Sequence, residues 1–395
     1  MKIFLVSGSR AEYGSQRKIL KLISEDTFFR MSLVVTGAHL SENHGNTINE
    51  IEFDGIEVSY KVGLRLIADD RIDTAFAVSD AINGFANVFA QSEPEFLLLV
   101  GDRYETFAAA TAAHLLGIPI GHVHGGEITE GAFDDSLRHS ITKMAHVHFV
   151  ANTEFRNRVI QLGEQPKNVH IVGGLGVDAI ASTERLNKLE LEARLGMKFS
   201  QRNFLITFHP TTLDSVSSEE QIRNLLVALD AFPDTNMIFT MPNSDPANSI
   251  IRTQIISYAE RHTSVKIFES LGNVAYLSTI PFVDCVIGNS SSGLSEVPSF
   301  GVPTVNIGIR QKGRPCASSV ISTGSSAGEI VKGIQLAISP DFKLISKNAI
   351  NPFGVAGASR KIVQIIKDTD ISNLQRKSFY DLKSHSIVEP SETES

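Results

Sequence analysis

Short, unbroken apolar runs recur along the chain, and each one ends in glycines or polar residues. The runs of the first half are residues 3–6, 31–36, 96–100, 119–123 and 147–150, and those of the second half are residues 204–208, 237–241, 265–268, 285–288 and 304–307. Unbroken runs are typical of strands that are buried on both faces of a parallel sheet, with helices between them. The sequence therefore predicts an α/β fold with two Rossmann-like units in series.

The series of runs restarts after the glycine-rich stretch 171–176, which places the boundary between the units near residues 174–200. We expect an N-terminal domain over residues 1–175 and a C-terminal domain over residues 190–358, facing each other across a central cleft. Open parallel sheets bind ligands beyond the carboxyl ends of their strands, so this cleft is the expected binding site. Residues 384–395 are mostly polar, which predicts a disordered tail.

Composition and charge exclude several classes of function. The formal net charge is −8, whereas a general nucleic-acid binder needs a basic face. No apolar run approaches the ~18 residues of a membrane span, and no signal peptide is recognisable, so we expect a cytoplasmic protein without a membrane partner. The two cysteines, Cys285 and Cys316, form no CxxC pair, and neither a disulfide framework nor a zinc site is predicted.

Three regions of the second half can hold a nucleoside diphosphate. Residues 288–296 read Gly-Asn-Ser-Ser-Ser-Gly-Leu-Ser-Glu, and their hydroxyl and N–H groups could cradle phosphates, while Glu296 suits the hydroxyls of a ribose. His209 could donate to a phosphate or protonate a leaving oxygen, and Asn243 ends the next strand. A basic loop, residues 310–314, follows the last of the predicted strands. The alternatives are ordinary helix capping and a solvated loop.

Two regions of the first half collect groups that can transfer protons. Asp102 and Arg103 follow the run 96–100, where charged groups are costly unless they are paired or used. The second region contains His122, His124, Glu127, Asp134 and Arg138. A His-x-His pair can bind a metal, but no cysteine or close carboxylate set completes a shell here, so acid and base roles are favoured.

The turn after the first run, residues 7–14, reads Ser-Gly-Ser-Arg-Ala-Glu-Tyr-Gly. Its glycines would let backbone N–H groups approach an anion, and Arg10 could add a bidentate phosphate contact. An ordinary tight turn is the alternative. The turn lacks the GxGxxG pattern, so a nicotinamide cofactor is not indicated.

Together these motifs resemble the UDP-N-acetylglucosamine 2-epimerase family, most closely the hydrolysing branch of sialic-acid and legionaminic-acid synthesis. The matching pieces are residues 9–14, 101–103, 125–127, 134–143, 209–211, 288–291 and 306–311, in family order. The resemblance implies a glycosyltransferase-B-like fold in which C-terminal helices, about residues 360–382, pack back on the N-terminal domain. It also implies no cofactor and no metal, and a homodimer or homotetramer.

The resemblance further implies a reaction, UDP-N-acetylglucosamine (UDP-GlcNAc) plus water to N-acetylmannosamine plus UDP, through a glycal that is hydrated with inversion at C2. The ligand-binding residues that it implies are Arg10, Gly14, Arg103, Arg138, Asn243, Leu271, Ser290, Ser291, Glu296 and Arg310. The catalytic residues that it implies are Asp102, His124, Glu127, Asp134 and His209. Some relatives carry a glutamate where this chain has His124, so His124 or Glu127 could be the C2 base, and the assignment stays open among Asp102, His124, Glu127 and Asp134.

Four alternatives remain open on the sequence alone. A hydrolysing 2-epimerase could act on UDP-N,N′-diacetylbacillosamine instead of UDP-GlcNAc. A non-hydrolysing epimerase would return a UDP-sugar and release no UDP. A glycosyltransferase of the same architecture would need an acceptor other than water, and a nucleotide-sugar sensor would leave its ligand intact.

Overall fold

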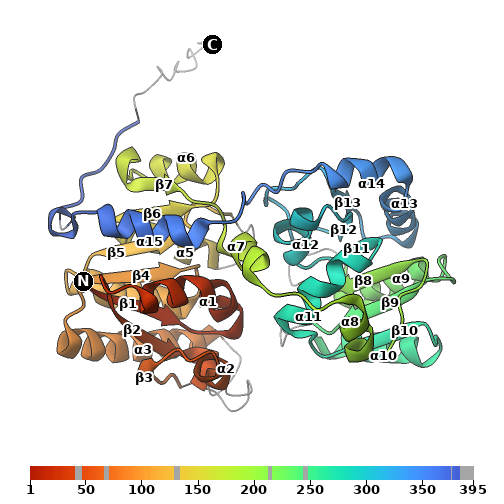
Figure 1. Cartoon of the computed structure of the whole chain (residues 1–395), viewed down its shortest axis with the longest axis horizontal. Helices are drawn as coiled ribbons and strands as arrows, with labels where there is room; N and C mark the ends of the chain where they lie inside the picture. The colour runs from red at the N-terminus through yellow and green to blue at the C-terminus, as the bar shows by residue number, and fades with distance from the viewer. Residues whose placement is uncertain are drawn as a thin grey trace, which may run out of the picture.

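Two parallel sheets lie side by side in the computed structural model, each covered by helices on both faces (Figure 1). The structure describes residues 1–40, 47–65, 71–128, 134–211, 216–242, 248–374 and 376–382. The predicted fold class, two Rossmann-like α/β units, is confirmed. None of the helices in these ranges is both long and apolar enough to span a membrane.

In the described part of the chain, the N-terminal sheet has seven strands in the order β3-β2-β1-β4-β5-β6-β7. The strands are β1 (Lys2–Ser7), β2 (Arg30–Thr36), β3 (Val58–Val62), β4 (Phe96–Val100), β5 (Ile120–Val123), β6 (Val147–Val150) and β7 (Val169–Ile171). The helices of this half are α1 (Arg10–Glu25), α2 (Ile48–Phe53), α3 (Arg71–Ser92), α4 (Tyr104–Leu115), α5 (Asp134–Met144), α6 (Thr153–Gln161) and α7 (Leu175–Ser182).

The C-terminal sheet has six strands in the described ranges, in the order β10-β9-β8-β11-β12-β13. The strands are β8 (Asn203–Thr207), β9 (Asn236–Thr240), β10 (Val265–Phe268), β11 (Cys285–Gly288), β12 (Thr304–Ile307) and β13 (Val320–Thr323). The helices are α8 (Lys188–Leu195), α9 (Ser218–Leu229), α10 (Asn248–Glu260), α11 (Gly272–Thr279), α12 (Ser292–Ser295), α13 (Ala327–Ala337), α14 (Pro340–Lys347) and α15 (Ala358–Asp368). Of these, α15 lies on the N-terminal half.

The unbroken apolar runs are explained by two cores on either side of each sheet. In β1, Ile3 and Leu5 pack in the core that contains α1 and α15, whereas Phe4 packs in the core that contains α3 and α4. In β8, Phe204 and Leu205 divide between two cores in the same way. Successive side chains of a strand point to opposite faces, so a strand that is covered on both faces is apolar at every position.

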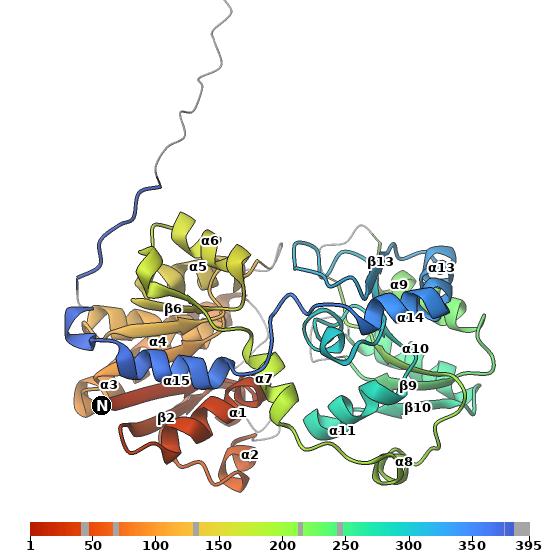
Figure 2. The same ribbon diagram turned by 45° about the horizontal axis from the view of Figure 1, so that its top comes forward.

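The chain passes between the two halves twice. It leaves the N-terminal half through α7 and returns through residues 349–357 to α15, which contacts α1 (Figures 1 and 2). Where the passages meet, Gly173 and Gly354 have φ of 95° and 90°, and a Cβ on Gly354 would lie 3.3 Å from the Cα of Gly173. Only glycine tolerates both this φ and this close approach without strain.

Beyond α15, the chain forms a 3₁₀ turn, Ile371–Asn373, and residues 376–382 then run without helix or strand along the N-terminal half (Figure 1). The predicted domain limits, 1–175 and 190–358, stay predictions. The predicted tail, 384–395, lies outside the described residues.

Candidate active site

Each sheet has a point where its strand order reverses, and the predicted motifs lie at these two points. In the N-terminal sheet, β1 neighbours β4, and in the C-terminal sheet, β8 neighbours β11. The loops that leave such neighbouring strands diverge to opposite faces and leave a crevice, which is where open α/β sheets bind ligands. Ser9 and Asp102 follow β1 and β4, and His209 and Ser290 follow β8 and β11.

The fully buried side chain of Asn289 joins three of the C-terminal motifs. Its Oδ1 accepts a hydrogen bond from His209 N (2.7 Å), and its Nδ2 donates to His209 O (2.8 Å). Its backbone carbonyl accepts from Arg310 Nη1 (3.1 Å) and Gln311 Nε2 (2.8 Å). The loops after β8, β11 and β12 are therefore bound to one another. The sequence motifs contained Asn289 and Gln311, but nothing in them indicated this role.

Gly288 allows β11 to approach β8 closely. Its φ is 136°, and a Cβ would lie 1.9 Å from Thr207 O, so no other residue fits there without rearrangement. The half-buried Ser290 and Ser291 follow and lead into α12. Their hydroxyls and the first N–H groups of the helical turn are the kind of donors that phosphate oxygens accept.

Glu296 lies at the end of α12 and accepts a hydrogen bond from one hydroxyl group, which a second hydroxyl group contacts in turn. Ser292 Oγ donates to the Glu296 carboxylate, and Tyr276 Oη lies 2.8 Å from Ser292 Oγ. Burial raises the pKa of Glu296, and the hydrogen bond from Ser292 opposes this effect. Leu271, predicted to meet the base of the nucleotide, is buried directly before α11.

His209 is neutral at neutral pH. Burial and then the positive charge of Arg310 lower the pKa of His209 to about 4. A neutral imidazole can still donate one N–H to a phosphate, and a bound diphosphate would offset the charge of Arg310.

The predicted acid and base groups meet at the carboxyl ends of β4 and β5. Arg138, on α5, donates to the Asp102 carboxylate and lies 3.5 Å from Asp135. Burial, followed by the negative charge of Asp102, raises the pKa of Asp134 to about 6. Asp134 therefore carries a proton for part of the time near neutral pH, as a general acid requires.

His124 and Glu127 form a pair, with His124 Nδ1 2.8 Å from Glu127 Oε1. Although burial opposes ionisation, the charge and hydrogen bond of His124 lower the pKa of Glu127 below its ordinary value. An ionised carboxylate only accepts, so Nδ1 carries the hydrogen toward Glu127, and Nε2 is the nitrogen that is left to exchange a proton with a ligand. The backbone of His124 also has a φ of 69°, a left-handed conformation that residues other than glycine adopt uncommonly. Such backbone conformations cluster at functional sites.

Arg314 connects the two halves of the site. It follows β12 of the C-terminal sheet, and burial lowers its pKa, while the nearby carboxylates of Glu127 and Asp102 act in the opposite direction. Since such interactions fall off with distance, Arg314 lies within electrostatic reach of the acid and base groups of the N-terminal half. One site therefore receives residues from both sheets.

Glu12 and Glu105 are carboxylates that the sequence did not single out. Gly8 N donates to Glu12 Oε2 (2.7 Å), so the amide that we expected to face an anion binds this side chain instead. Burial and then Glu105 raise the pKa of Glu12 to about 7. Arg103 binds the buried Glu105 through Nε and Nη2, both at 3.2 Å. The sequence signal that could have identified Glu12 was its position in a glycine-containing turn directly after a buried strand.

The remaining predicted residues lie as follows. Gly14 is within α1, and a Cβ there would have no neighbour within 4 Å. Arg10 begins α1, but its side chain and the whole of Asn243 lie outside the described residues. His122 is buried and binds Thr142 Oγ1 (3.1 Å) and Gly101 O (2.9 Å). Over the described ranges, no three His, Cys, Asp or Glu side chains group as metal ligands.

Two parallel sheets, each covered by helices on both faces, define a two-domain fold of the glycosyltransferase-B type. The crystal structure of Methanocaldococcus jannaschii UDP-GlcNAc 2-epimerase with UDP-GlcNAc and UDP has this fold, with a TM-score of 0.76 over 93% of this chain and 100% of that chain, at 17% identity. The model of the UDP-N-acetylglucosamine 2-epimerase family matches residues 21–367. The chain belongs to this family.

Relatives with higher identity place the chain within the family. The GDP/UDP-N,N′-diacetylbacillosamine 2-epimerase (hydrolyzing) of Campylobacter jejuni is 37% identical, over 96% of this chain and 99% of that protein. The polysialic acid biosynthesis protein P7 of Escherichia coli is 38% identical, over 96% and 97%. The predicted resemblance to the hydrolysing branch is confirmed, and the chain is an enzyme of that type.

The pKa of Glu12 leads to a prediction for Glu12→Gln. Folding raises the pKa of the Glu12 carboxyl from 4.5 to about 7. Below pH 4.5 this carboxyl is protonated in both the folded and the unfolded state, so it does not lower the free energy of unfolding. Wild-type stability then falls as the pH rises to 7, by on the order of 1–3 kcal/mol. Glu12→Gln removes this loss. The difference between its free energy of unfolding and that of the wild type, measured by urea denaturation, should therefore increase from pH 4.5 to pH 7.

Glu25→Gln is the matched control, because Glu25 ends the same helix and its side chain is 62% exposed. Its stability relative to the wild type should vary little over the same pH range. A Glu12→Gln curve that runs parallel to the wild-type curve would contradict the burial of a charge at this position.

Proposed function

We propose that the chain hydrolyses UDP-GlcNAc to N-acetylmannosamine and UDP with inversion at C2, for the synthesis of sialic-acid-type sugars. The observation that carries this proposal is the His124–Glu127 pair beside Arg314. A histidine base that a carboxylate orients, together with a cation from the opposite sheet, suits a reaction that removes a proton while a diphosphate leaves.

The C-terminal half binds the nucleotide in this proposal. Ser290, Ser291 and Arg310 face the diphosphate, and His209 donates one N–H to it. The carboxylate of Glu296 accepts hydrogen bonds from the ribose hydroxyls, which would take over from Ser292 as donors. Leu271 contributes backbone groups to the uracil. Arg10, Gly14, Arg103, Arg138 and Asn243 complete the proposed ligand contacts.

The reaction proceeds in two steps that balance. In the first step, Nε2 of His124 takes the proton from C2, the electron pair forms the C1–C2 double bond, and the C1–O bond breaks to release UDP. In the second step, the oxygen of water adds to C1 and gives one proton to the carboxylate of Asp102, while C2 takes a proton from the opposite face. The proton that His124 removed is released to solvent. Glu127 orients His124 and stabilises its cationic form, as a carboxylate does for histidine in hydrolases.

Inversion at C2 requires a proton donor other than His124, because the new proton arrives from the other face. Asp134 suits this role, since a carboxyl with a pKa of about 6 is partly protonated near neutral pH. Asp102, bound by Arg138, lies beside it and can orient the water. No step of this mechanism calls for a metal or an organic cofactor.

A second candidate substrate is UDP-N,N′-diacetylbacillosamine. The name of the Campylobacter jejuni relative, at 37% identity over nearly the full length of both chains, favours it. The chemistry at C1 and C2 is the same for both substrates. They differ at C4 and C6, so the pocket around those atoms would decide between them.

We further propose a homodimer or homotetramer in the cytoplasm. Exposed apolar side chains on α3, Ile72 and Phe76, support a subunit contact, because large apolar groups that project from one helix face often pack against a second chain. The unpaired thiols of Cys285 and Cys316 fit a reducing compartment.

The decisive experiment follows the purified protein with UDP-GlcNAc in deuterated water by proton NMR. The expected products are free UDP and N-acetylmannosamine that carries deuterium at C2, because the C2 proton is exchanged with solvent. Turnover of the diacetamido substrate alone would move the assignment to that sugar. Turnover of neither would contradict the proposed function.

Variants of the histidine–carboxylate pair test its role. Glu127→Gln should lower kcat by about 10²-fold with little change in KM, because a neutral amide stabilises cationic His124 less. His124→Gln should lower kcat at least as much. The control is Asp230→Asn, which alters a histidine–carboxylate contact of 3.5 Å with His262, far from the site. Equal kcat values for Glu127→Gln and Asp230→Asn would refute the assignment.

A further inference from the structure

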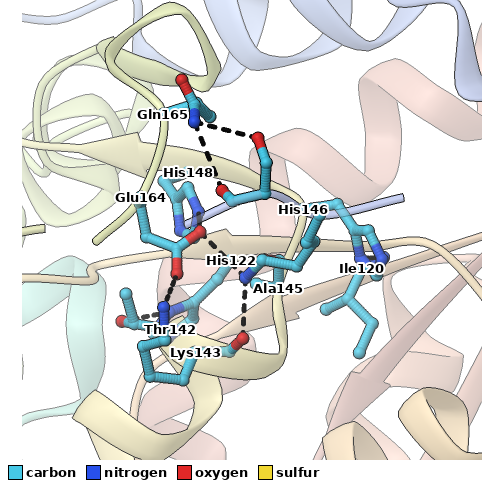
Figure 3. A network of polar contacts seen from close by, with 11 residues as sticks. Ile120, His122, Thr142, Lys143, Ala145, His146, His148, Glu164 and Gln165 are labelled. Atoms are coloured by element: carbon cyan, nitrogen blue, oxygen red, sulfur yellow. Dashed lines mark hydrogen bonds and ion pairs between the residues drawn. The ribbon is translucent and has the colours of Figure 1, made fainter. Parts of the chain in front are cut away.

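Glu164 is a buried carboxylate with three partners, none of which belongs to the active site. It is 3% exposed and accepts from Lys143 Nζ (2.6 Å), His148 Nε2 (3.0 Å) and Lys377 Nζ (2.8 Å) (Figure 3). Although burial opposes ionisation, the hydrogen bonds from His148, Lys143 and Lys377 lower the pKa of Glu164 to about 2. The carboxylate therefore stays ionised over the whole range in which the enzyme can be assayed.

Lys377 also closes the end of α5. Its Nζ donates to Lys143 O (2.7 Å) and to Ala145 O, which are carbonyls at the end of this helix. The last carbonyls of a helix have no partner within it, and a cation there also interacts favourably with the helix dipole. All three donors of the ammonium group are thus used, two on α5 and one on Glu164.

The segment around Lys377, residues 376–382, is here called the C-terminal strap. Tyr380 N donates to Gly163 O (2.9 Å), and Gln165 Nε2 donates to Ser378 Oγ (3.0 Å). The ring of Phe379 lies over Lys143 Nζ, 5.0 Å away, and covers Gly163, where a Cβ would lie 2.2 Å from the ring. Backbone, amide and ring contacts of the residues after Lys377 therefore also fix the strap to the N-terminal half.

The elements that the strap holds lead to the active site. Thr142, the residue before Lys143, binds His122, and His122 in turn binds the carbonyl of Gly101, which precedes Asp102. One and two turns back along α5, Arg138 and Asp134 face the same Asp102. Helix α5 is thus tied to Asp102 near its beginning and to Glu164 and the strap at its end.

We propose that Lys377 is a positioning residue, which fixes α5 through Glu164 and thereby holds Asp134 and Arg138 against Asp102. This inference rests on the proposed function, because it assigns Asp134 a proton-transfer role. Lys377 touches no reacting group and acts only through the helix. Small shifts of groups that transfer protons are costly to rate, so loss of the anchor should appear in kcat.

The test compares Lys377→Met with Lys377→Arg and Lys367→Met. Lys377→Met keeps the apolar stem and removes the charge and the donors, whereas Lys377→Arg keeps both. Lys367 is the matched control: it lies on α15, also in the C-terminal region, and binds Asp26 of the N-terminal half at 2.7 Å without contacting α5.

We expect Lys377→Met to lower kcat by about tenfold and to leave KM and UDP affinity within about twofold, because the nucleotide loops are on the other sheet. Hydrogen exchange of the α5 amides should accelerate by about tenfold or more. Lys377→Arg should restore both values to within about threefold of the wild type, and Lys367→Met should change neither.

A third readout separates positioning from general destabilisation. The charged groups around Asp134 are Asp102, Arg103, Arg138 and Glu105. If α5 moves, Asp134 becomes more exposed and less affected by Asp102, so the alkaline limb of the kcat–pH profile, on which Asp134 loses its proton, should move to lower pH in Lys377→Met alone. Thermal destabilisation without movement of α5 would leave this limb in place.

Unchanged kcat and α5 exchange in Lys377→Met, or equal losses in Lys367→Met, would overturn the proposal. Failure of the proposed function is distinguishable, because the wild type itself would then turn over neither UDP-sugar. The exchange experiment needs no substrate, so faster α5 exchange in Lys377→Met and not in Lys367→Met would still establish the anchor, and its absence would still refute it.

Discussion

The site depends first on the buried amide of Asn289. The Asn289 side chain satisfies both backbone groups of His209, and the backbone carbonyl of Asn289 accepts hydrogen bonds from the side chains of Arg310 and Gln311. In a buried position, each of these groups would be costly without its partner, so the loops after β8, β11 and β12 have one arrangement in which all are satisfied. This arrangement brings the serines, the histidine and the arginine to the carboxyl ends of β8, β11 and β12.

The two halves divide the work according to their side chains. The C-terminal half presents hydroxyls, backbone N–H groups and Arg310, which suit a diphosphate. The N-terminal half presents carboxyl groups and His124, whose differing environments give Asp134 a raised pKa and Glu127 a lowered one. Arg314, which follows β12 of the C-terminal sheet, contributes a positive charge near this acidic region. In the function that we propose, this division separates nucleotide binding from proton transfer while keeping both within reach of one sugar.

Much of the fold followed from the unbroken apolar runs, but strands exposed on one side escaped prediction. β3 and β13 are edge strands with partly exposed residues, and β7 has three residues of which one is buried. Each motif directly follows a strand of the sequence pattern. Because neighbouring parallel strands end at the same edge of a sheet, the motif positions predicted that the candidate residues would lie close together. Pairwise contacts did not follow from sequence: Gly8 N binds Glu12, and Lys377 reaches Glu164 from 213 positions away along the chain (377 minus 164). Only the folded chain brings such residues together.

The most direct test of this division is the affinity for UDP, measured by titration calorimetry on the wild type, Glu296→Ala and Glu127→Gln. The account predicts that Glu296→Ala weakens UDP binding by about tenfold or more, since a charged hydrogen-bond partner of the ribose is lost. It predicts that Glu127→Gln, which alters only the proton-transfer side, binds UDP within about twofold of the wild type. Full UDP affinity in Glu296→Ala together with a large loss in Glu127→Gln would contradict it.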